Sequence, residues 1–130
     1  MKQEVLMVDD SQFEADILSH ALSKVSDSVK LVLQQDAEAA LGRLEAGERP
    51  HLLLLDLRMP LIDGFQFMEQ IQARSIPDLP IVVLTSSTDD DDRRRSLDAG
   101  ATDFRTKPAS LDGYRELARY IVERIATPQI

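Results

Sequence analysis

The chain alternates short apolar runs with segments in which apolar residues recur at helical spacing. The apolar runs predict five strands, at residues 5–8, 29–33, 52–55, 81–84 and 102–106. The run at 52–55 is Leu at every position, which is typical of a strand buried on both faces. This central run therefore indicates a parallel sheet rather than an antiparallel one.

Segments of helical period follow each of these runs. They lie at 11–24, from 36 to a stop at Gly47, from 63 onward, at about 88–99 before Gly100, and from 111 until about four residues before the last residue. Ser11 with Glu14 three positions later predicts a capping box, and Asp36 predicts another N-cap. These signals mark where the helices begin.

Five strand-then-helix units in a row predict an α/β fold, with a parallel sheet and helices on both of its faces. Chain chirality makes the crossovers right-handed. A length of 130 residues suits one domain with its own core. We therefore expect a single domain over residues 1–130, without a linker or an output domain.

Composition narrows the classes of function. The net charge is −8 and the sequence pI is about 4.7, which argues against nucleic acid as a partner. The chain has no cysteine, so disulfides and thiolate metal sites are excluded. The apolar runs are too short to span a membrane, and the first residues do not resemble a signal peptide. We expect a soluble protein in the cytoplasm.

Polar residues follow the predicted strands where each strand ends. Asp9 and Asp10 follow the first strand, Asp56 the third, Thr85 the fourth and Lys107 the fifth. In a parallel sheet these ends meet at one edge, where open α/β folds bind their ligands. Carboxylates gathered there repel each other and need a cation, and oxygen ligands favour Mg²⁺ over zinc.

The same residue types suit phosphoryl transfer. A cation beside Asp56 keeps its carboxylate ionised as a nucleophile. Lys107 offers a compact positive charge for a phosphoryl oxygen, and Thr85 offers a hydroxyl donor for another. A nucleophile, a metal, a cation and a hydroxyl together make a site for phosphoryl transfer.

Short motifs in this order resemble a known family. They are Val8-Asp9-Asp10, Leu55-Asp56-Leu57-Arg58-Met59-Pro60 with Asp63-Gly64, Leu84-Thr85-Ser86, Asp98-Ala99-Gly100-Ala101 and Thr106-Lys107-Pro108. The chain resembles the receiver domains of bacterial response regulators, which act in two-component systems and phosphorelays. The resemblance implies a flavodoxin-like (CheY-like) three-layer α/β/α fold, with a five-stranded parallel sheet of order 2-1-3-4-5 and five helices.

The resemblance also implies a role for each acid. Asp56 would become an aspartyl phosphate, taking its phosphoryl group from a phosphohistidine on a histidine kinase or a histidine phosphotransfer protein. Asp10, Asp56 and the backbone carbonyl of Arg58 would ligate Mg²⁺, and Asp9 would act through a water molecule. No organic cofactor is implied. The chain would be a phosphoacceptor that catalyses its own phosphorylation and dephosphorylation, rather than an enzyme.

Further residues take roles in switching by the same resemblance. Lys107 and Thr85 would hold the phosphoryl group, and the Lys107–Pro108 peptide bond would be cis. Thr85 and Phe104 would be the switch pair, with Thr85 moving toward the phosphate and Phe104 turning inward. Arg58 and Ser87 stand at the two positions that tune phosphate lifetime in the family.

The expected output is a change of the face formed by helix four, strand five and helix five. That face would contact a downstream protein, and many members of the family also form homodimers through it. No nucleic acid or membrane partner is expected. The chain would then be a single-domain response regulator.

Three alternatives compete with this interpretation. A degenerate receiver would act only by binding, but it would normally lose Asp56, Asp10 or Lys107. A haloacid-dehalogenase-like phosphatase also uses an Asp nucleophile and Mg²⁺, but it needs a second Asp where this chain has Arg58. A flavin carrier needs a phosphate-binding loop after the first strand, and acids stand there instead.

The charged run at 89–95 combines four Asp with three Arg. Its spacing predicts ion pairs four residues apart on a solvated helix face, namely Asp89–Arg93, Asp90–Arg94 and Asp91–Arg95. The acids also suit the positive end of a helix. Because this helix has few apolar residues, we expect it to be mobile.

Overall fold

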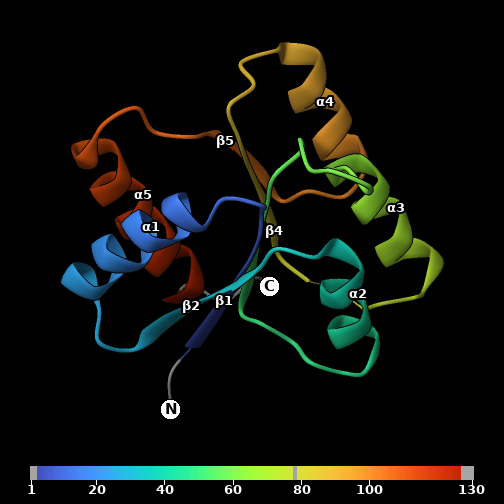
Figure 1. Cartoon of the computed structure of the whole chain (residues 1–130), viewed down its shortest axis with the longest axis horizontal. Coiled ribbons are helices and arrows are strands. Elements are labelled where there is room, and N and C mark those ends of the chain that lie inside the picture. The colour runs from blue at the N-terminus through green and yellow to red at the C-terminus, as the bar shows by residue number, and fades with distance from the viewer. Residues whose placement is uncertain (1–2, 78, 127–130) are drawn as a thin grey trace.

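The computed structural model describes residues 3–77 and 79–126, which form alternating strands and helices (Figure 1). The strands are β1 (Gln3–Val8), β2 (Val29–Gln34), β3 (Leu52–Leu55), β4 (Ile81–Thr85) and β5 (Asp103–Thr106). The helices are α1 (Gln12–Val25), α2 (Ala37–Glu45), α3 (Gly64–Ala73), α4 (Asp90–Asp98) and α5 (Leu111–Ala126). Each predicted element is present, with its ends moved by one or two residues.

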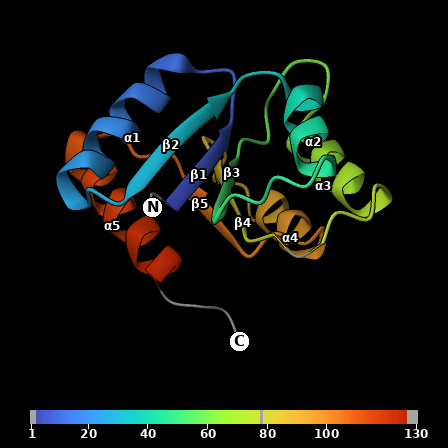
Figure 2. The same cartoon turned by 90° about the horizontal axis from the view of Figure 1, so that it is seen from below.

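The five strands form one parallel sheet in the order β2-β1-β3-β4-β5, which confirms the predicted topology. Helices α1 and α5 cover one face of the sheet, and α2, α3 and α4 cover the other (Figures 1 and 2). Within the described ranges, none of these helices is long and apolar enough to cross a membrane. The fold is the three-layer α/β/α arrangement.

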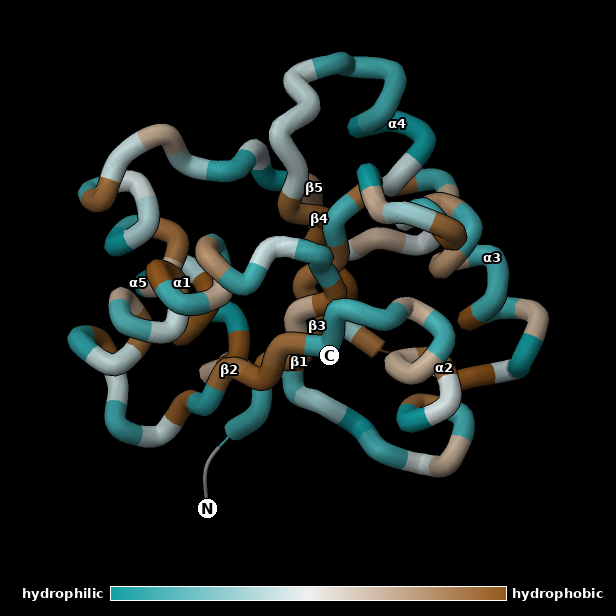
Figure 3. The backbone as a smooth tube through the Cα atoms, viewed as in Figure 1, coloured by the Kyte–Doolittle hydropathy of each residue, from teal (hydrophilic) through white to brown (hydrophobic). Residues whose placement is uncertain are grey.

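Strand β3 is the centre of the core. All four of its leucines are fully buried, because the strand is covered on both faces. Leu53 and Leu55 pack into the cluster beneath α2 and α3, whereas Leu52 and Leu54 pack into the cluster beneath α1 and α5. The alternation follows from the two-residue period of a strand. Figure 3 shows the resulting apolar centre with more polar helices around it.

The helix ends follow the predicted chemistry with one exception. The Ser11 hydroxyl accepts a hydrogen bond from the Glu14 amide at 3.2 Å, and Asp36 caps α2 in the same way. The Glu14 carboxylate does not complete a capping box and turns instead toward Lys107. Gly47 has a φ of 108°, in the left-handed region that suits glycine after a helix.

Helix α4 differs from its prediction in how its charges are paired. The helix begins at Asp90 with Asp89 as its N-cap. None of the three predicted i,i+4 ion pairs occurs among the described residues. Asp91 pairs with Arg94, and Asp92 pairs with Arg58 outside the helix. The prediction was wrong because the arginines have other partners: Arg93 lies over the ring of Phe104, and Arg95 lies over the ring of Phe65. A pair along an exposed helix contributes only about 0.2–0.5 kcal/mol, which is too little to compete.

The start of α3 packs directly on the backbone that carries Asp56. The Gly64 amide donates to the Leu57 carbonyl at 3.0 Å. A Cβ atom at position 64 would lie 2.7 Å from the Asp56 carbonyl oxygen and 2.8 Å from the Leu57 Cα. Both are backbone atoms that cannot rotate away, so glycine is required at this close approach.

We therefore expect Gly64→Ala to lower the free energy of unfolding by about 1–3 kcal/mol, because the methyl group overpacks the β3–α3 junction. Urea denaturation would measure the loss. Gly42→Ala in α2 is the matched control, since nothing lies within 4 Å of its added Cβ. That substitution should stabilise by about 0.5–1 kcal/mol through helix propensity. Equal effects of the two substitutions would contradict the packing argument.

Candidate functional site

Three carboxylates gather at the carboxyl edge of the sheet. Val8 pairs with Leu55 in the register of β1 and β3, and the Asp56 amide donates to the Val8 carbonyl at 3.1 Å. The next residues of each strand therefore lie side by side. One oxygen from each of Asp9, Asp10 and Asp56 lies within 4.8 Å of the others. The structure thus brings together the three acids that the sequence predicted.

Two of these acids are buried, which makes their charges costly. Asp9 is 1% exposed and Asp56 is 5% exposed, whereas Asp10 is exposed. Burial, helped by the nearby charge of Asp56, raises the pKa of Asp9 to about 6, although the contact with Lys107 acts to lower it. A divalent cation would relieve the same repulsion. Three carboxylates at the mouth of a sheet form an all-oxygen donor set that fits Mg²⁺.

Lys107 supplies the positive charge at this edge. Its ammonium lies 3.0 Å from Asp9, 3.3 Å from Asp56 and 2.6 Å from Glu14, measured to the nearest carboxylate oxygen. Burial alone would lower the pKa of Lys107, but the bonds to Glu14 and Asp9 outweigh it and raise that pKa. The lysine is therefore held as a charged group next to the Asp56 carboxylate.

The predicted cis peptide bond is wrong. The bond between Lys107 and Pro108 is trans in the structure. Trans is the intrinsically favoured form of an X–Pro bond by about 0.5–1 kcal/mol. The Lys107 amide donates to the Thr85 carbonyl at 2.7 Å, which continues the β4–β5 pairing. With that anchor the side chain reaches the acids without a cis bond.

The two predicted switch residues are both buried. Thr85 is fully buried at the end of β4, and its hydroxyl accepts a hydrogen bond from the Ser87 amide at 3.4 Å. Phe104 is 6% exposed and belongs to the core cluster beneath α2 and α3. The Arg93 guanidinium lies 6.0 Å from the centre of its ring. Their movement on phosphorylation stays a prediction.

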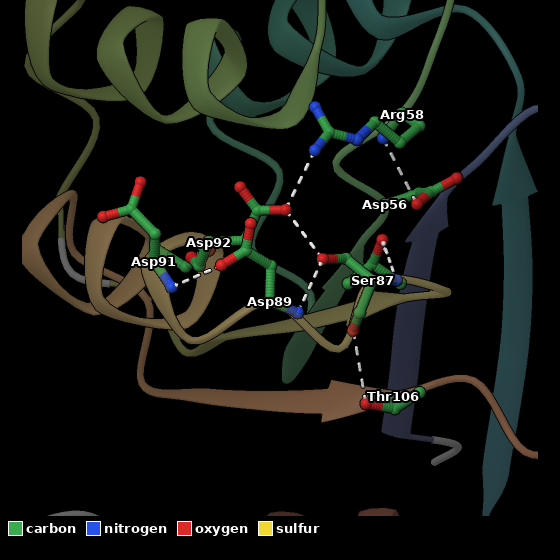
Figure 4. Close-up of polar contacts among 9 residues, drawn as sticks. Asp56, Arg58, Ser87, Asp89, Asp91, Asp92 and Thr106 are labelled. Carbon is green, nitrogen blue, oxygen red and sulfur yellow. Dashed lines mark hydrogen bonds and ion pairs between the residues drawn. The ribbon is translucent and has the colours of Figure 1, made fainter.

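A polar network connects the loop after β3 with the loop after β4 (Figure 4). The Arg58 amide donates to Asp56 Oδ1 at 3.3 Å, while its guanidinium donates to Asp92 Oδ2 at 2.9 Å. The Ser87 hydroxyl donates to the same Asp92 oxygen at 2.7 Å. The residues that stand two positions after Asp56 and after Thr85 therefore share one carboxylate on α4.

The sequence did not indicate two of the residues at this edge. Glu14 was assigned only to a capping box, and no pattern predicts that its carboxylate crosses to Lys107 instead. Asp92 was one of four consecutive aspartates assigned to a solvated face, yet it is 5% exposed. The structure shows that Asp92 and Ser96, four residues apart on one face of α4, are both buried. This helical spacing is the only feature of the sequence that could have placed Asp92 on the inner face.

Comparison with known proteins gives a consistent result. The sequence model of the response regulator receiver domain matches residues 5–119. The response regulator MprA of Mycolicibacterium vanbaalenii is 36% identical over 124 residues, which cover 95% of this chain and 52% of that protein. MprA of Mycobacterium tuberculosis has the same identity and coverage. The chain thus spans about half the length of these curated relatives.

Solved structures agree with the fold. The phosphorylated cyanobacterial phytochrome response regulator RcpA superimposes with a TM-score of 0.86 at 25% identity, covering 100% of this chain and 98% of that chain. The Mn²⁺-bound form of the response regulator Rcp1 superimposes with a TM-score of 0.83 at 26% identity, covering 98% of each chain. One relative of this architecture therefore binds a divalent cation.

The acid cluster leads us to expect that Mg²⁺ stabilises the folded protein. At a concentration one hundred times the Kd, the gain should be about 2.7 kcal/mol, because the ion binds the folded chain alone. Thermal unfolding with and without Mg²⁺ would measure it. Asp10→Asn should lose most of the shift, since it removes one of the three acids. Asp27→Asn, an exposed acid outside the cluster, is the matched control, and the same loss in both variants would contradict the site.

Proposed function

Since the chain belongs to the response regulator receiver family, we propose that Asp56 accepts a phosphoryl group from a phosphohistidine on a partner protein. The observation that carries this proposal is the contact of Lys107 with Asp56 at 3.3 Å, beside a cluster of three acids. A buried carboxylate with a fixed cation and a set of metal-ligating oxygens has the parts that phosphoryl transfer needs. The partner would be a histidine kinase or a histidine phosphotransfer protein.

In the proposed reaction, a carboxylate oxygen of Asp56 attacks the phosphorus atom of the phosphohistidine. A new O–P bond forms as the N–P bond breaks, and the imidazole nitrogen keeps the electron pair of that bond. The Lys107 ammonium lies 3.3 Å from the attacking carboxylate, beside the place where the phosphoryl group would be bound. The product is an acyl phosphate, and attack of water on phosphorus later returns the carboxylate and inorganic phosphate.

Lys107 changes partners during this step. Before transfer its ammonium is shared among Asp9, Asp56 and Glu14. A phosphoryl group on Asp56 brings a charge of about −1.5 to −2 and three acceptor oxygens to the same place. The lysine then pairs with a phosphoryl oxygen, and Glu14 keeps the ammonium within the buried edge. Lys107 is thus a preformed electrostatic partner for the developing charge.

The acids of Asp9, Asp10 and Asp56, with the Arg58 carbonyl, would hold Mg²⁺. Bound there, the ion would neutralise the carboxylates and polarise a phosphoryl oxygen. The close approach of their carboxylate oxygens, which lie within 4.8 Å of one another, supports this assignment, since a cation would relieve the repulsion among them. In this role the chain is a phosphoacceptor that catalyses its own modification and hydrolysis, with no separate substrate to turn over.

We propose that the output is a change of the face formed by α4, β5 and α5. Thr85, which is buried, would move its hydroxyl toward the phosphoryl group, and Phe104, which lies on the neighbouring strand β5, would turn inward. A downstream protein, or a second copy of the chain, would bind that face. The new dianion acts by biasing a two-state equilibrium of these segments.

The test is the intact mass of the protein after incubation with acetyl phosphate and Mg²⁺. We expect one phosphoryl adduct on the wild type, because acetyl phosphate supplies the same electrophilic phosphorus as a phosphohistidine. Asp56→Asn should give no adduct, and removal of Mg²⁺ should suppress it. Lys107→Ala should reduce the rate by about 10²-fold or more, as expected for the loss of a preorganised charge.

Asp27→Asn is again the matched control and should react like the wild type. An adduct that survives in Asp56→Asn would contradict the assignment of the phosphoacceptor. A wild type that binds Mg²⁺ but never takes a phosphoryl group, even from purified histidine kinases, would identify a binding module instead of a phosphoacceptor.

A further inference from the structure

Helix α4 is attached to the domain mainly by polar contacts. Its buried residues are Asp92 and Ser96, and Leu97 is 40% exposed. The Ser96 hydroxyl bonds back to the Asp92 carbonyl at 2.7 Å, within the helix. Figure 3 shows most of this helix in the hydrophilic colour. Arg95 lies over the Phe65 ring at 3.9 Å, and the buried Asp92 carboxylate is another of the few groups that hold the helix in place.

The contacts of Asp92 lead straight to the phosphoacceptor (Figure 4). The Asp92 carboxylate accepts from the Arg58 guanidinium and from the Ser87 hydroxyl, both at Oδ2. Arg58 is the nearer link, since its own amide bonds to Asp56 Oδ1 at 3.3 Å. The Asp56 carboxylate thus lies close to the Arg58 backbone, well within the length of an extended arginine side chain. Arg58 can therefore reach either Asp92 or a phosphoryl group on Asp56.

We propose that Asp92 is a positioning residue that holds Arg58 on α4 until Asp56 is phosphorylated, when the guanidinium moves to the phosphoryl group. This inference rests on the proposed function and names how that site is coupled to its output helix. Asp92 touches none of the reacting atoms, and it acts only through Arg58. The exchange of one cation between two anions would be the event that releases α4.

The direction of the exchange follows from the strength of the two acceptors. Asp92 carries one charge, and its bonded oxygen already serves Ser87 as a second donor. A phosphoryl group carries about −1.5 to −2 charge on three oxygens, and the guanidinium fork fits it in a bidentate geometry. The Arg58 side chain is 65% exposed, so solvent already surrounds most of it and its rotation meets little packing. The Arg58 guanidinium should therefore leave Asp92 and bind the phosphoryl group when Asp56 is phosphorylated.

Loss of Arg58 leaves Asp92 in a costly position. A buried carboxylate that loses its cation is strongly destabilised, and the Asp92 side chain is only 7% exposed. The carboxylate regains solvation if the first turn of α4 moves outward, and few apolar contacts oppose that movement. Ser87 moves with it, because its hydroxyl bonds to Asp92 and its amide bonds to Thr85. The same event thus reaches the buried threonine of β4.

If Asp92 and a phosphoryl group compete for Arg58, then removal of the Asp92 charge frees the guanidinium to stabilise the charge that develops during transfer. We therefore expect Asp92→Asn to raise the rate of phosphorylation by acetyl phosphate about fivefold or more, the lower end of typical couplings between sites. Asp90→Asn is the matched control, because it removes an equal charge from an exposed position in the same turn. It should leave the rate unchanged.

A double-mutant cycle separates positioning from a purely structural role. In an Arg58→Ala background, Asp92→Asn should have no further effect on the rate, because the cation that it positions is gone. An effect of Asp92→Asn that persists undiminished without Arg58, or equal rates for Asp92→Asn and Asp90→Asn, would overturn the inference. If no protein in the series, wild type included, forms the adduct, the proposed function fails instead.

Hydrogen exchange gives a second test that does not require Asp92→Asn to fold. In the wild type, the amides of α4 should exchange about fivefold faster or more when Asp56 carries the phosphoryl group. In Arg58→Ala they should exchange faster already and respond little to phosphorylation. Unchanged α4 exchange in a fully phosphorylated wild type would overturn the inference while leaving the phosphoryl chemistry intact.

Discussion

The structure depends on the concentration of negative charge at one edge of a parallel sheet. Two of three neighbouring aspartates are buried there, and one lysine ammonium lies among them. Neither the acids nor the lysine would be stable alone in that position, because an unpaired buried charge is strongly disfavoured. The fold brings Lys107 to this edge, where its ammonium contacts Asp9, Asp56 and Glu14. The repulsion that remains among the three aspartates would be relieved by a divalent cation.

The arrangement of the elements could be predicted because it follows from local rules. Five apolar runs with helical segments between them favour a parallel sheet, and a run of only four leucines among them favours a strand buried on both faces. Gly47 follows its helix with a backbone in the left-handed region. Glycine is the residue that adopts this conformation most readily, so the end of the helix could be predicted from the residue type. The carboxyl-edge site was predictable for a related reason. In a parallel sheet the carboxyl ends of all strands lie at one edge. Asp9, Asp56 and Lys107 each follow a strand, so they could be placed at that edge without knowledge of the loops.

What could not be predicted depends on choices between competing partners. Glu14 had a local role open to it in a capping box, but a buried lysine offered a stronger contact across the fold. Asp92 had a partner available within its own helix, but it bonds to Arg58, 34 residues away in the chain. The partner that each of these side chains takes depends on which groups lie near it in the folded chain, and residue spacing gives no information on that.

The polar attachment of α4 has a consequence for how such a domain can diversify. Helices α2 and α3 are fixed by large side chains that interlock with the sheet, so most changes on their inner faces disturb the core. Helix α4 rests on Asp92 and Ser96. Among its other positions, Asp90, Asp91 and Arg94 are exposed, so substitutions there should have little effect on folding. Such substitutions would change the surface that α4 offers to a partner and leave the acid cluster unchanged.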